Sequence, residues 1–210
     1  MSRFGWLLVV AVSLICASAA CAQTAQEGSG GGGCTTALLV IDVQNAYVPR
    51  TGLATVDGAD LVTRLVAVLA AARGAGIPVI YIKQIEQRFA NGNPLGDIVA
   101  AIAPLEGDPV IWKPTSDAFM QTELKNLLSG MGVNRVLLCG LATHGCVNET
   151  LYGAIGGAYE TWVIADAHGD TAGPGLETYY NANWPILGVH VVPSTEINFP
   201  QFGCASPIAP

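Results

Sequence analysis

Basic residues are scarce in this sequence. Only 9 of its 210 residues are lysine or arginine, against 16 aspartate and glutamate residues, and the formal net charge is −7 at pH 7. Nucleic acids and anionic membrane surfaces are bound through clustered lysine and arginine side chains. The composition therefore argues against nucleic-acid binding and favours a small neutral or polar molecule as the partner.

Charged residues of either sign are also few. They make up 12% of the chain, whereas hydrophobic residues make up 51% and glycine contributes 25 residues. Such a chain is too apolar to be disordered and can bury a full hydrophobic core. With 210 residues, we expect one α/β domain or at most two small domains.

The N-terminal apolar segment is too short to span a membrane. Arg3 precedes a short apolar run from Trp6 to Ile15, which small residues follow, whereas a spanning helix needs about 20 apolar residues. The pattern predicts a signal peptide over residues 1–22 and an exported protein, either periplasmic or secreted. A second interpretation remains open, in which a lipoprotein signal ends before Cys21 and a lipid anchor on that cysteine tethers the protein to a membrane.

Residues 23–33 offer almost nothing to bury. Their glycine-rich run predicts a flexible Gly/Ser linker, so we expect the folded domain to occupy residues 34–210. Cys34 and Cys204 flank the two ends of this domain. In an exported protein these two cysteines are a possible disulfide, although the sequence does not show that the ends meet.

Short β-branched runs alternate with helical patterns from Thr35 onward. This alternation predicts an α/β fold, a three-layer α/β/α domain with a mainly parallel six-stranded Rossmann-like sheet. The expected strands are 37–42, 78–83, 109–112, 135–139, 161–165 and 189–192. The expected helices are 56–75, 117–131 and 146–159, with shorter helical pieces near 95–102 and 176–183.

Reactive side chains stand where three of these strands end. Ligands of open parallel sheets bind outside the carboxyl ends of the strands, and Asp42 and Lys113 occupy such positions. Cys146 would begin a helix, where the helix dipole favours a thiolate, whereas Cys139 inside a strand fits a buried structural cysteine. Asp42 alone could equally cap a turn, and Lys113 alone could be a surface lysine.

Four segments occur in an order and spacing typical of one enzyme superfamily. They are Leu38-Leu-Val-Ile-Asp-Val-Gln-Asn; Lys113 with Ser116, Phe119, Thr122 and Leu124; Gly140-Leu-Ala-Thr-His-Gly-Cys-Val; and Val163-Ile-Ala-Asp-Ala. With these segments, residues 37–197 resemble the isochorismatase-like cysteine hydrolases, a superfamily that includes nicotinamidases, N-carbamoylsarcosine amidase and ureide or biuret amidohydrolases.

The resemblance implies a catalytic triad. By position, Asp42 would be the general base, Lys113 would orient that base and support the thiolate, and Cys146 would be the nucleophile. The Leu141–Ala142 peptide would be cis, and the backbone N–H groups of Ala142 and Cys146 would form the oxyanion hole.

The resemblance also implies a reaction. An exported cysteine hydrolase would cleave the C–N bond of a small amide or ureide through a thioester on its cysteine. The presence of Cys146 favours this reaction over that of the isochorismatases proper, which lack the cysteine. The alternative is a non-catalytic or ligand-binding envelope protein of the same fold. A homo-oligomer is suggested by the resemblance and by the small-residue helix 151–159. The substrate and the number of subunits stay open.

Histidine, the usual ligand of a catalytic metal, is missing between Asp42 and Lys113. Because nicotinamidases of the superfamily bind a metal there, we expect no metal and no other cofactor, and nicotinamidase activity is disfavoured. Several side chains are candidates for the pocket wall from their positions alone. They are Gln44, Lys83, Gln84, Trp112, Phe119, His144 and His168.

Overall fold

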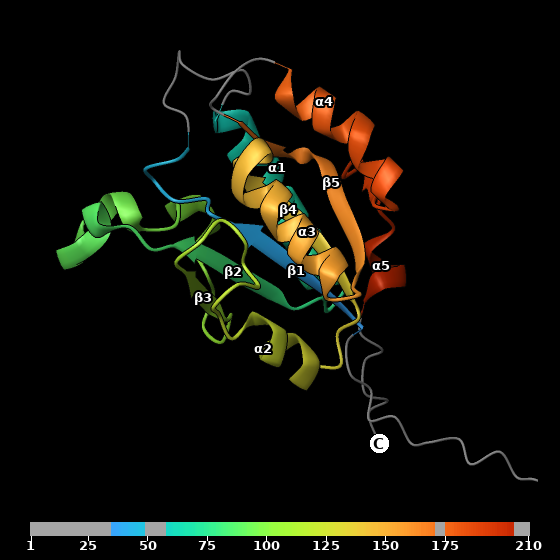
Figure 1. Cartoon of the computed structure of the whole chain (residues 1–210), viewed down its shortest axis with the longest axis horizontal. Coiled ribbons are helices and arrows are strands. Elements are labelled where there is room, and N and C mark those ends of the chain that lie inside the picture. The colour runs from blue at the N-terminus through green and yellow to red at the C-terminus, as the bar shows by residue number, and fades with distance from the viewer. Residues whose placement is uncertain (1–34, 49–57, 171–174, 204–210) are drawn as a thin grey trace, which may run out of the picture. The chain divides into compact units, whose positions relative to one another are not determined.

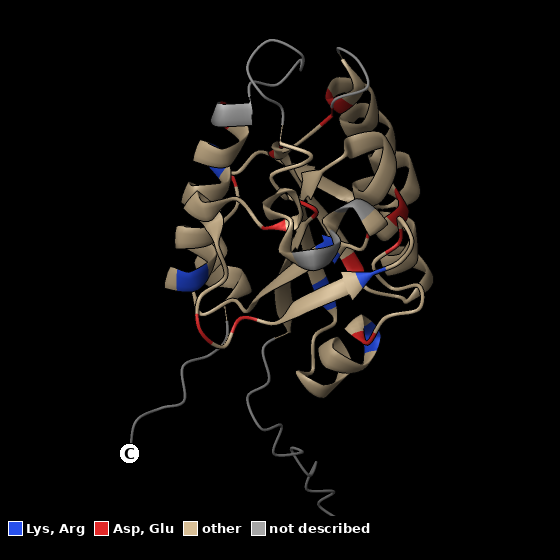
Figure 2. Ribbon diagram, turned by 90° about the vertical axis from the view of Figure 1, so that its left-hand side faces the viewer, with Lys and Arg blue, Asp and Glu red and all other residues tan. Residues whose placement is uncertain are grey.

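The computed structural model describes residues 35–48, 58–170 and 175–203. The expected signal peptide, the linker, Cys21 and the possible Cys34–Cys204 disulfide all lie outside these residues. The described ranges contain no helix that is long and apolar enough to cross a membrane. Lysine and arginine residues are spread over several elements of the fold (Figure 2).

The sheet has six strands, and every neighbouring pair is parallel (Figure 1). Their spatial order is β3-β2-β1-β4-β5-β6. The strands are β1 (Thr36–Ile41), β2 (Val79–Gln84), β3 (Val110–Lys113), β4 (Arg135–Leu141), β5 (Glu160–Gly169) and β6 (His190–Val192). The predicted fold class is confirmed, and the sheet is parallel throughout.

Alternate residues of the central strand β1 serve two separate cores. Leu38 and Val40 pack with helix α1 (Gly58–Gly74) on one face, whereas Leu39 and Ile41 pack with α2 (Leu124–Gly130) and α3 (Asn148–Gly156) on the other. Successive side chains of a strand point to opposite faces. A strand buried on both faces therefore reads as a continuous apolar run.

Two further helices complete the layers. Helix α5 (Phe199–Phe202) contributes both of its phenylalanines to the α1 side of the sheet. Helix α4 (Leu176–Asn183) leads into a 3₁₀ turn whose Trp184 lies in the core on the α2 and α3 side. Three other 3₁₀ turns lie between β2 and β3. They are Gln87–Gly92, Pro94–Gly96 and Ala100–Ile102.

Some predicted helices are shorter in the structure. The helix expected over 117–131 forms only from residue 124, because side chains before it bond to the backbone in turns: Asp117 Oδ1 accepts from the Phe119 N–H at 2.8 Å. The helix expected from residue 146 begins at residue 148, after a π-helical turn over Thr143–Val147. The helical piece expected at 95–102 is two of the 3₁₀ turns.

Strand β5 is longer than expected and bulges where it passes the end of β4. The register between the two strands shifts between Leu138 and Gly140, after which Gly140 pairs with His168. Gly140 has φ of 119°, and a Cβ there would lie 2.1 Å from the Ile41 carbonyl oxygen. Only glycine lets β4 pass this close to β1 in that conformation. The chain that follows is thereby placed beside the end of β1.

Candidate active site

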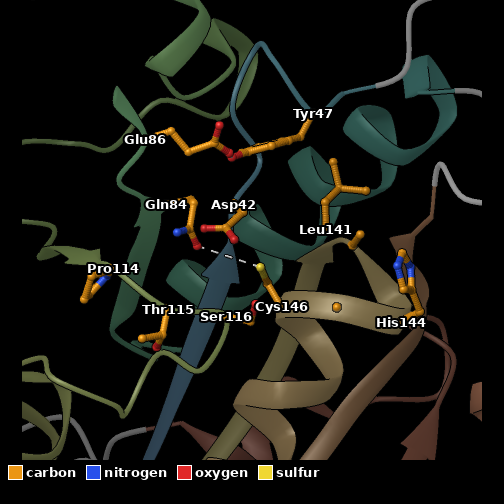
Figure 3. Close-up of a pocket in the computed structure, with 12 residues that line it drawn as sticks. Asp42, Tyr47, Gln84, Glu86, Pro114, Thr115, Ser116, Leu141, His144 and Cys146 are labelled. Atoms are coloured by element: carbon orange, nitrogen blue, oxygen red, sulfur yellow. Dashed lines mark hydrogen bonds between the residues drawn. The ribbon is translucent and has the colours of Figure 1, made fainter. Parts of the chain in front are cut away.

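Four neighbouring strands deliver polar side chains to one edge of the sheet. In the order β3-β2-β1-β4, Lys113 ends β3, Gln84 ends β2, Asp42 follows β1, and Cys146 lies in the turn after β4. The carboxyl ends of parallel strands meet at one edge of the sheet. The structure therefore brings together the three residues for which the sequence suggests a catalytic triad (Figure 3).

Lys113 and Asp42 form a buried ion pair. The Lys113 Nζ lies 2.8 Å from Asp42 Oδ2, and the two side chains are 0% and 2% exposed. The Lys113 ammonium also donates to the Thr115 carbonyl oxygen at 3.0 Å and to Gln84 Oε1. The interpretation of Lys113 as a surface lysine is wrong, because its side chain has no exposed surface and is paired with the Asp42 carboxylate.

The Asp42 carboxylate is held mainly by its ion pair with Lys113. Apart from this pair, neither of its buried oxygens has a hydrogen bond of ordinary geometry in the described part of the chain. The turn with Gln44 is closed by the Asp42 backbone carbonyl, 2.8 Å from the Gln44 nitrogen, so the side chain is not a turn cap. Burial raises the pKa of Asp42, and the positive charge of Lys113 opposes this rise.

The Cys146 thiol is only partly accessible and faces the same cluster. Its Sγ lies 4.0 Å from Gln84 Oε1. Burial, together with the negative charge of Asp42, raises the pKa of the Cys146 thiol to about 11, while Lys113 acts in the opposite direction. These effects together favour the thiol over the thiolate. Cys146 lies in the π-helical turn Thr143–Val147, before the first residue of α3, and not at the first position of the helix as expected.

The turn that carries Cys146 is held by its own backbone. The peptide bond between Leu141 and Ala142 is cis. The Ala142 carbonyl oxygen accepts hydrogen bonds from the N–H groups of Gly145 at 3.0 Å and Val147 at 3.1 Å. These two bonds close a tight loop around the residue that separates them, Cys146. Its position is thus set by backbone contacts on both sides.

The end of β5 supports this turn through a buried histidine. Asn181 donates from Nδ2 to the Ala165 carbonyl oxygen, so its Oδ1 accepts from His168 Nε2 at 2.9 Å. His168 Nδ1 is then the acceptor for the Thr143 hydroxyl at 2.9 Å. Burial lowers the pKa of His168, in agreement with a neutral ring. His168 therefore positions the turn and does not line the pocket as expected.

A pocket of about 390 Å³ opens over the cluster, a size suited to a small molecule. Figure 3 shows the Asp42 carboxylate, Gln84 and the Cys146 thiol facing one another within it. The described lining residues come from the ends of β1 to β4 and the loops after them. They are Asp42, Tyr47, Gln84, Glu86, Pro114, Thr115, Ser116, Leu141, Ala142, His144, Gly145 and Cys146.

Two of the positional candidates, Gln84 and His144, line this pocket. Gln44 does not, because its amide links the end of β2 to a 3₁₀ turn: Nε2 donates to the Gly96 carbonyl oxygen at 2.9 Å, and Oε1 accepts from the Gln84 N–H at 2.8 Å. Gln44 has no exposed surface. It supports the wall from behind.

Three further candidates also lie outside the described lining. The Lys83 ammonium lies over the face of the Trp112 ring, 4.2 Å from its centre, so the two side chains form a cation–π pair with each other. Phe119 packs on Tyr159, with ring centres 5.4 Å apart. Alternation along a strand explains the Lys83 and Trp112 errors, because each precedes a site residue and points to the opposite face.

Tyr47 and Glu86 are pocket residues that the sequence reasoning missed. The Tyr47 hydroxyl donates a hydrogen bond to Glu86 Oε1 across the mouth of the pocket (Figure 3). Both follow a strand end by a few residues, which is the one signal that could have pointed to them. The lining residue Ser116 belongs to one of the four segments that resemble the superfamily, and Thr115, also in the lining, directly precedes it.

Cys139 contrasts with Cys146. Its side chain is fully buried in β4, and its Sγ lies 3.5 Å from the Leu39 carbonyl oxygen. Burial raises the pKa of Cys139 far above its ordinary value. Within the described residues, no group of three or more His, Cys, Asp or Glu side chains could hold a metal ion.

Comparisons with known proteins agree with this arrangement. The family model for the isochorismatase domain matches residues 36–190. The uncharacterized isochorismatase family protein YddQ of Bacillus subtilis is 33% identical over 138 residues, 63% of this chain and 77% of that protein. Ureidoacrylate amidohydrolase RutB of Methylorubrum extorquens is 29% identical over 181 residues, 68% of this chain and 73% of that protein.

A solved structure shows the same fold. The N-carbamoylsarcosine amidase of Thermoplasma acidophilum superposes with a TM-score of 0.66 at 26% identity, covering 78% of this chain and 99% of that one. The parallel sheet, the buried ion pair beside a cysteine and the extent of the family match lead to one assignment. This chain belongs to the isochorismatase family.

Proposed function

We propose that this protein is a cysteine hydrolase that cleaves the C–N bond of a small amide or ureide through a thioester on Cys146. The observation that carries the proposal is the buried Asp42–Lys113 ion pair beside the Cys146 thiol, inside a pocket of small-molecule size. The similarity to an amidohydrolase and to a carbamoylsarcosine amidase supports the reaction class.

The first half-reaction forms the thioester. Asp42 takes the proton of the Cys146 thiol as the sulfur attacks the substrate carbonyl carbon, since a thiol with a pKa of about 11 needs a base at neutral pH. The C–N bond of the tetrahedral intermediate then breaks, and Asp42 returns the proton to the leaving nitrogen. The N–H groups of Ala142 and Cys146 are the proposed donors to the oxyanion.

The second half-reaction releases the acid. Asp42, again ionised, takes a proton from a water molecule, and the resulting hydroxide attacks the thioester carbonyl carbon. The C–S bond breaks, and the sulfur leaves as the protonated thiol when Asp42 passes the proton on. The buried Lys113 charge keeps Asp42 ionised between these steps, opposing the rise in its pKa that burial causes.

A substrate screen tests the proposal. The purified protein is incubated with a panel of primary amides, ureides and carbamoyl compounds, and ammonia release is measured. We expect release with at least one compound, loss of this activity in Cys146→Ala, and a mass increase equal to the acyl group on Cys146 in rapidly quenched samples. Cys139→Ala is the matched control and should keep activity, because that thiol lies in the core.

Two outcomes would contradict the proposal. Full ammonia release by Cys146→Ala would exclude the covalent route. Binding of panel compounds without any ammonia release would instead support a non-catalytic, ligand-binding protein of the same fold.

We also propose that the protein acts outside the cytoplasm, on the basis of its first 22 residues. Fractionation of cells that produce the whole chain tests this placement. Retention of the full-length chain in the cytoplasm would refute export. Comparison with Cys21→Ser distinguishes the two forms of export, because only a lipid-anchored protein would lose membrane association in that variant.

A further inference from the structure

A second pocket lies away from the active site, bordered by α3, α4 and the 3₁₀ turn Trp184–Leu187. Its volume is about 360 Å³, which suits a small molecule. None of its described lining residues lines the active-site pocket. Four of the eight are aromatic, namely Tyr152, Tyr179, Tyr180 and Trp184. The pocket is therefore a separate, aromatic-lined cavity.

The aromatic rings stand at steep angles to one another. The planes of Tyr179 and Tyr180 meet at 88°, with ring centres 5.3 Å apart, and Trp184 lies 5.3 Å beyond Tyr180. Tyr179 is 61% exposed, and Tyr152 on α3 is 50% exposed. Rings at steep angles around one space present their negative faces from more than one direction, which is how proteins hold quaternary ammonium groups.

The N–H groups of the lining side chains are used within the protein. The Trp184 indole donates to Asn148 Oδ1 at 3.0 Å. The Asn183 amide donates to the Tyr179 carbonyl oxygen at 2.7 Å, and its Oδ1 has no hydrogen bond in the described part of the chain. Besides the tyrosine hydroxyls, the pocket thus offers a ligand ring faces and one amide oxygen. Both attract positive charge.

The charge around this pocket also favours a cation. The sequence contains no lysine or arginine after Arg135, although six acidic residues follow. Both helices of the pocket belong to this part of the chain, and each has a glutamate in its first turn, Glu149 or Glu177. Burial raises the pKa of the Tyr180 hydroxyl, and nearby negative charges, including those of Asp170 and Glu149, raise it further.

We propose that this pocket binds the quaternary ammonium group of a small organic cation, at a site separate from the active site. The charge would lie against the tyrosine faces, and the methyl groups would contact the apolar side chains of Ile186 and Leu187. A metal ion fits less well, because it takes several oxygen ligands and ring faces supply none. This inference does not depend on the proposed hydrolase activity.

Calorimetry on the whole chain tests the site with choline as the probe. The comparison ligand is 3,3-dimethylbutanol, in which a carbon atom replaces the nitrogen of choline, so that the shape is kept and the charge is removed. We expect choline to bind about tenfold more tightly than this alcohol at pH 7, the size of effect that a partly desolvated cation–π contact supplies.

Two substitutions at one position separate the ring face from the size of the side chain. Tyr179→Leu should weaken choline about fivefold and the alcohol less than about twofold, because it keeps an apolar side chain but removes the ring. Tyr179→Phe keeps the ring and should change the affinity for choline less than about twofold. Trp112→Leu is the matched control, an exposed aromatic residue on β3, and should change neither affinity.

Vesicles of phosphatidylcholine distinguish the source of the ammonium group. Co-sedimentation that Tyr179→Leu abolishes would assign the pocket to a lipid headgroup. Binding of choline without co-sedimentation would assign it to a free molecule.

Two results would overturn the cation site. One is equal affinity for choline and the alcohol, or equal weakening of both by Tyr179→Leu. The other is self-association of the chain that Tyr179→Leu abolishes, together with no binding of choline, which would assign the aromatic pocket to a second copy of the protein.

Discussion

The ionisation of Cys146 gives the sharpest test of the proposed chemistry. A pKa of about 11, against an ordinary value of 9.0, lowers the thiolate fraction at pH 8 about 100-fold, since each unit is about a factor of ten. Iodoacetamide reacts with the thiolate. We therefore expect alkylation of Cys146 at pH 8 to be about 100-fold slower than that of an ordinary thiol and to keep rising beyond pH 10.

Asp42→Asn should move two rates in opposite directions. It removes a negative charge that raises the pKa of the Cys146 thiol and leaves Lys113, which lowers it, so alkylation at pH 8 should become several-fold faster. Hydrolysis should fall by about 10²–10⁴, because the general base is lost. The buried Lys113 charge loses its partner, at a cost of about 3–5 kcal/mol, so both rates are measured where thermal unfolding shows the variant to be folded.

The assay needs one background correction. Alkylation is followed by mass spectrometry, and Cys146→Ser reports any reaction at other cysteines. Ordinary alkylation at pH 8 in the unsubstituted protein would refute the resting thiol. Slower alkylation of folded Asp42→Asn would refute the effect of the Asp42 charge on the thiol, and unchanged hydrolysis by that variant would refute Asp42 as the base.

Two further predictions concern the ion pair and the close approach of β4 to β1. Lys113→Met removes the charge that lowers the pKa of Asp42, and because Asp42 works as a base only when ionised, the acid limb of the pH profile of kcat/KM should move up by about 1–3 pH units. Substitution of an exposed lysine, Lys125→Met, should leave the limb in place. An unmoved limb in Lys113→Met would count against this role of Lys113. Gly140→Ala should lower the free energy of unfolding, measured in urea, by more than about 3 kcal/mol, since its Cβ would lie 2.1 Å from a backbone oxygen at a φ of 119°. The control Gly74→Ala, whose Cβ would have nothing within 4 Å, should change this free energy by less than about 1 kcal/mol. Equal effects of the two substitutions would show that the close approach is unimportant.

The central strands could be predicted because burial on both faces gives an unmistakable pattern. Residues 36–41 are all buried, so β1 appears in the sequence as an uninterrupted apolar run from Ala37 to Ile41. Helix limits were harder to predict. The turn that precedes α2 depends on the Asp117 side chain bonding to the Phe119 N–H, a local alternative to the helix that apolar periodicity does not reveal.

The reactive side chains could be predicted from strand ends and resemblance, but the wall around them could not. Gln44 and His168 stand at the correct edge, yet their side chains bond to other parts of the protein behind the pocket. Tyr47 and Glu86 reach the pocket from loops whose paths depend on tertiary contacts. The protonation state of Cys146 was also out of reach, because burial and the charge of Asp42 act only in the assembled site.

The site has two parts that differ in how they are held. Asp42 follows the central strand β1 and Lys113 ends the edge strand β3, where backbone hydrogen bonds to β2 and to the residue after it restrict both, whereas Tyr47, Glu86 and Thr115 belong to loops. Loops tolerate substitution better than a parallel sheet does. During evolution, a descendant could therefore exchange its specificity by remodelling these connections while inheriting the reactive centre unchanged.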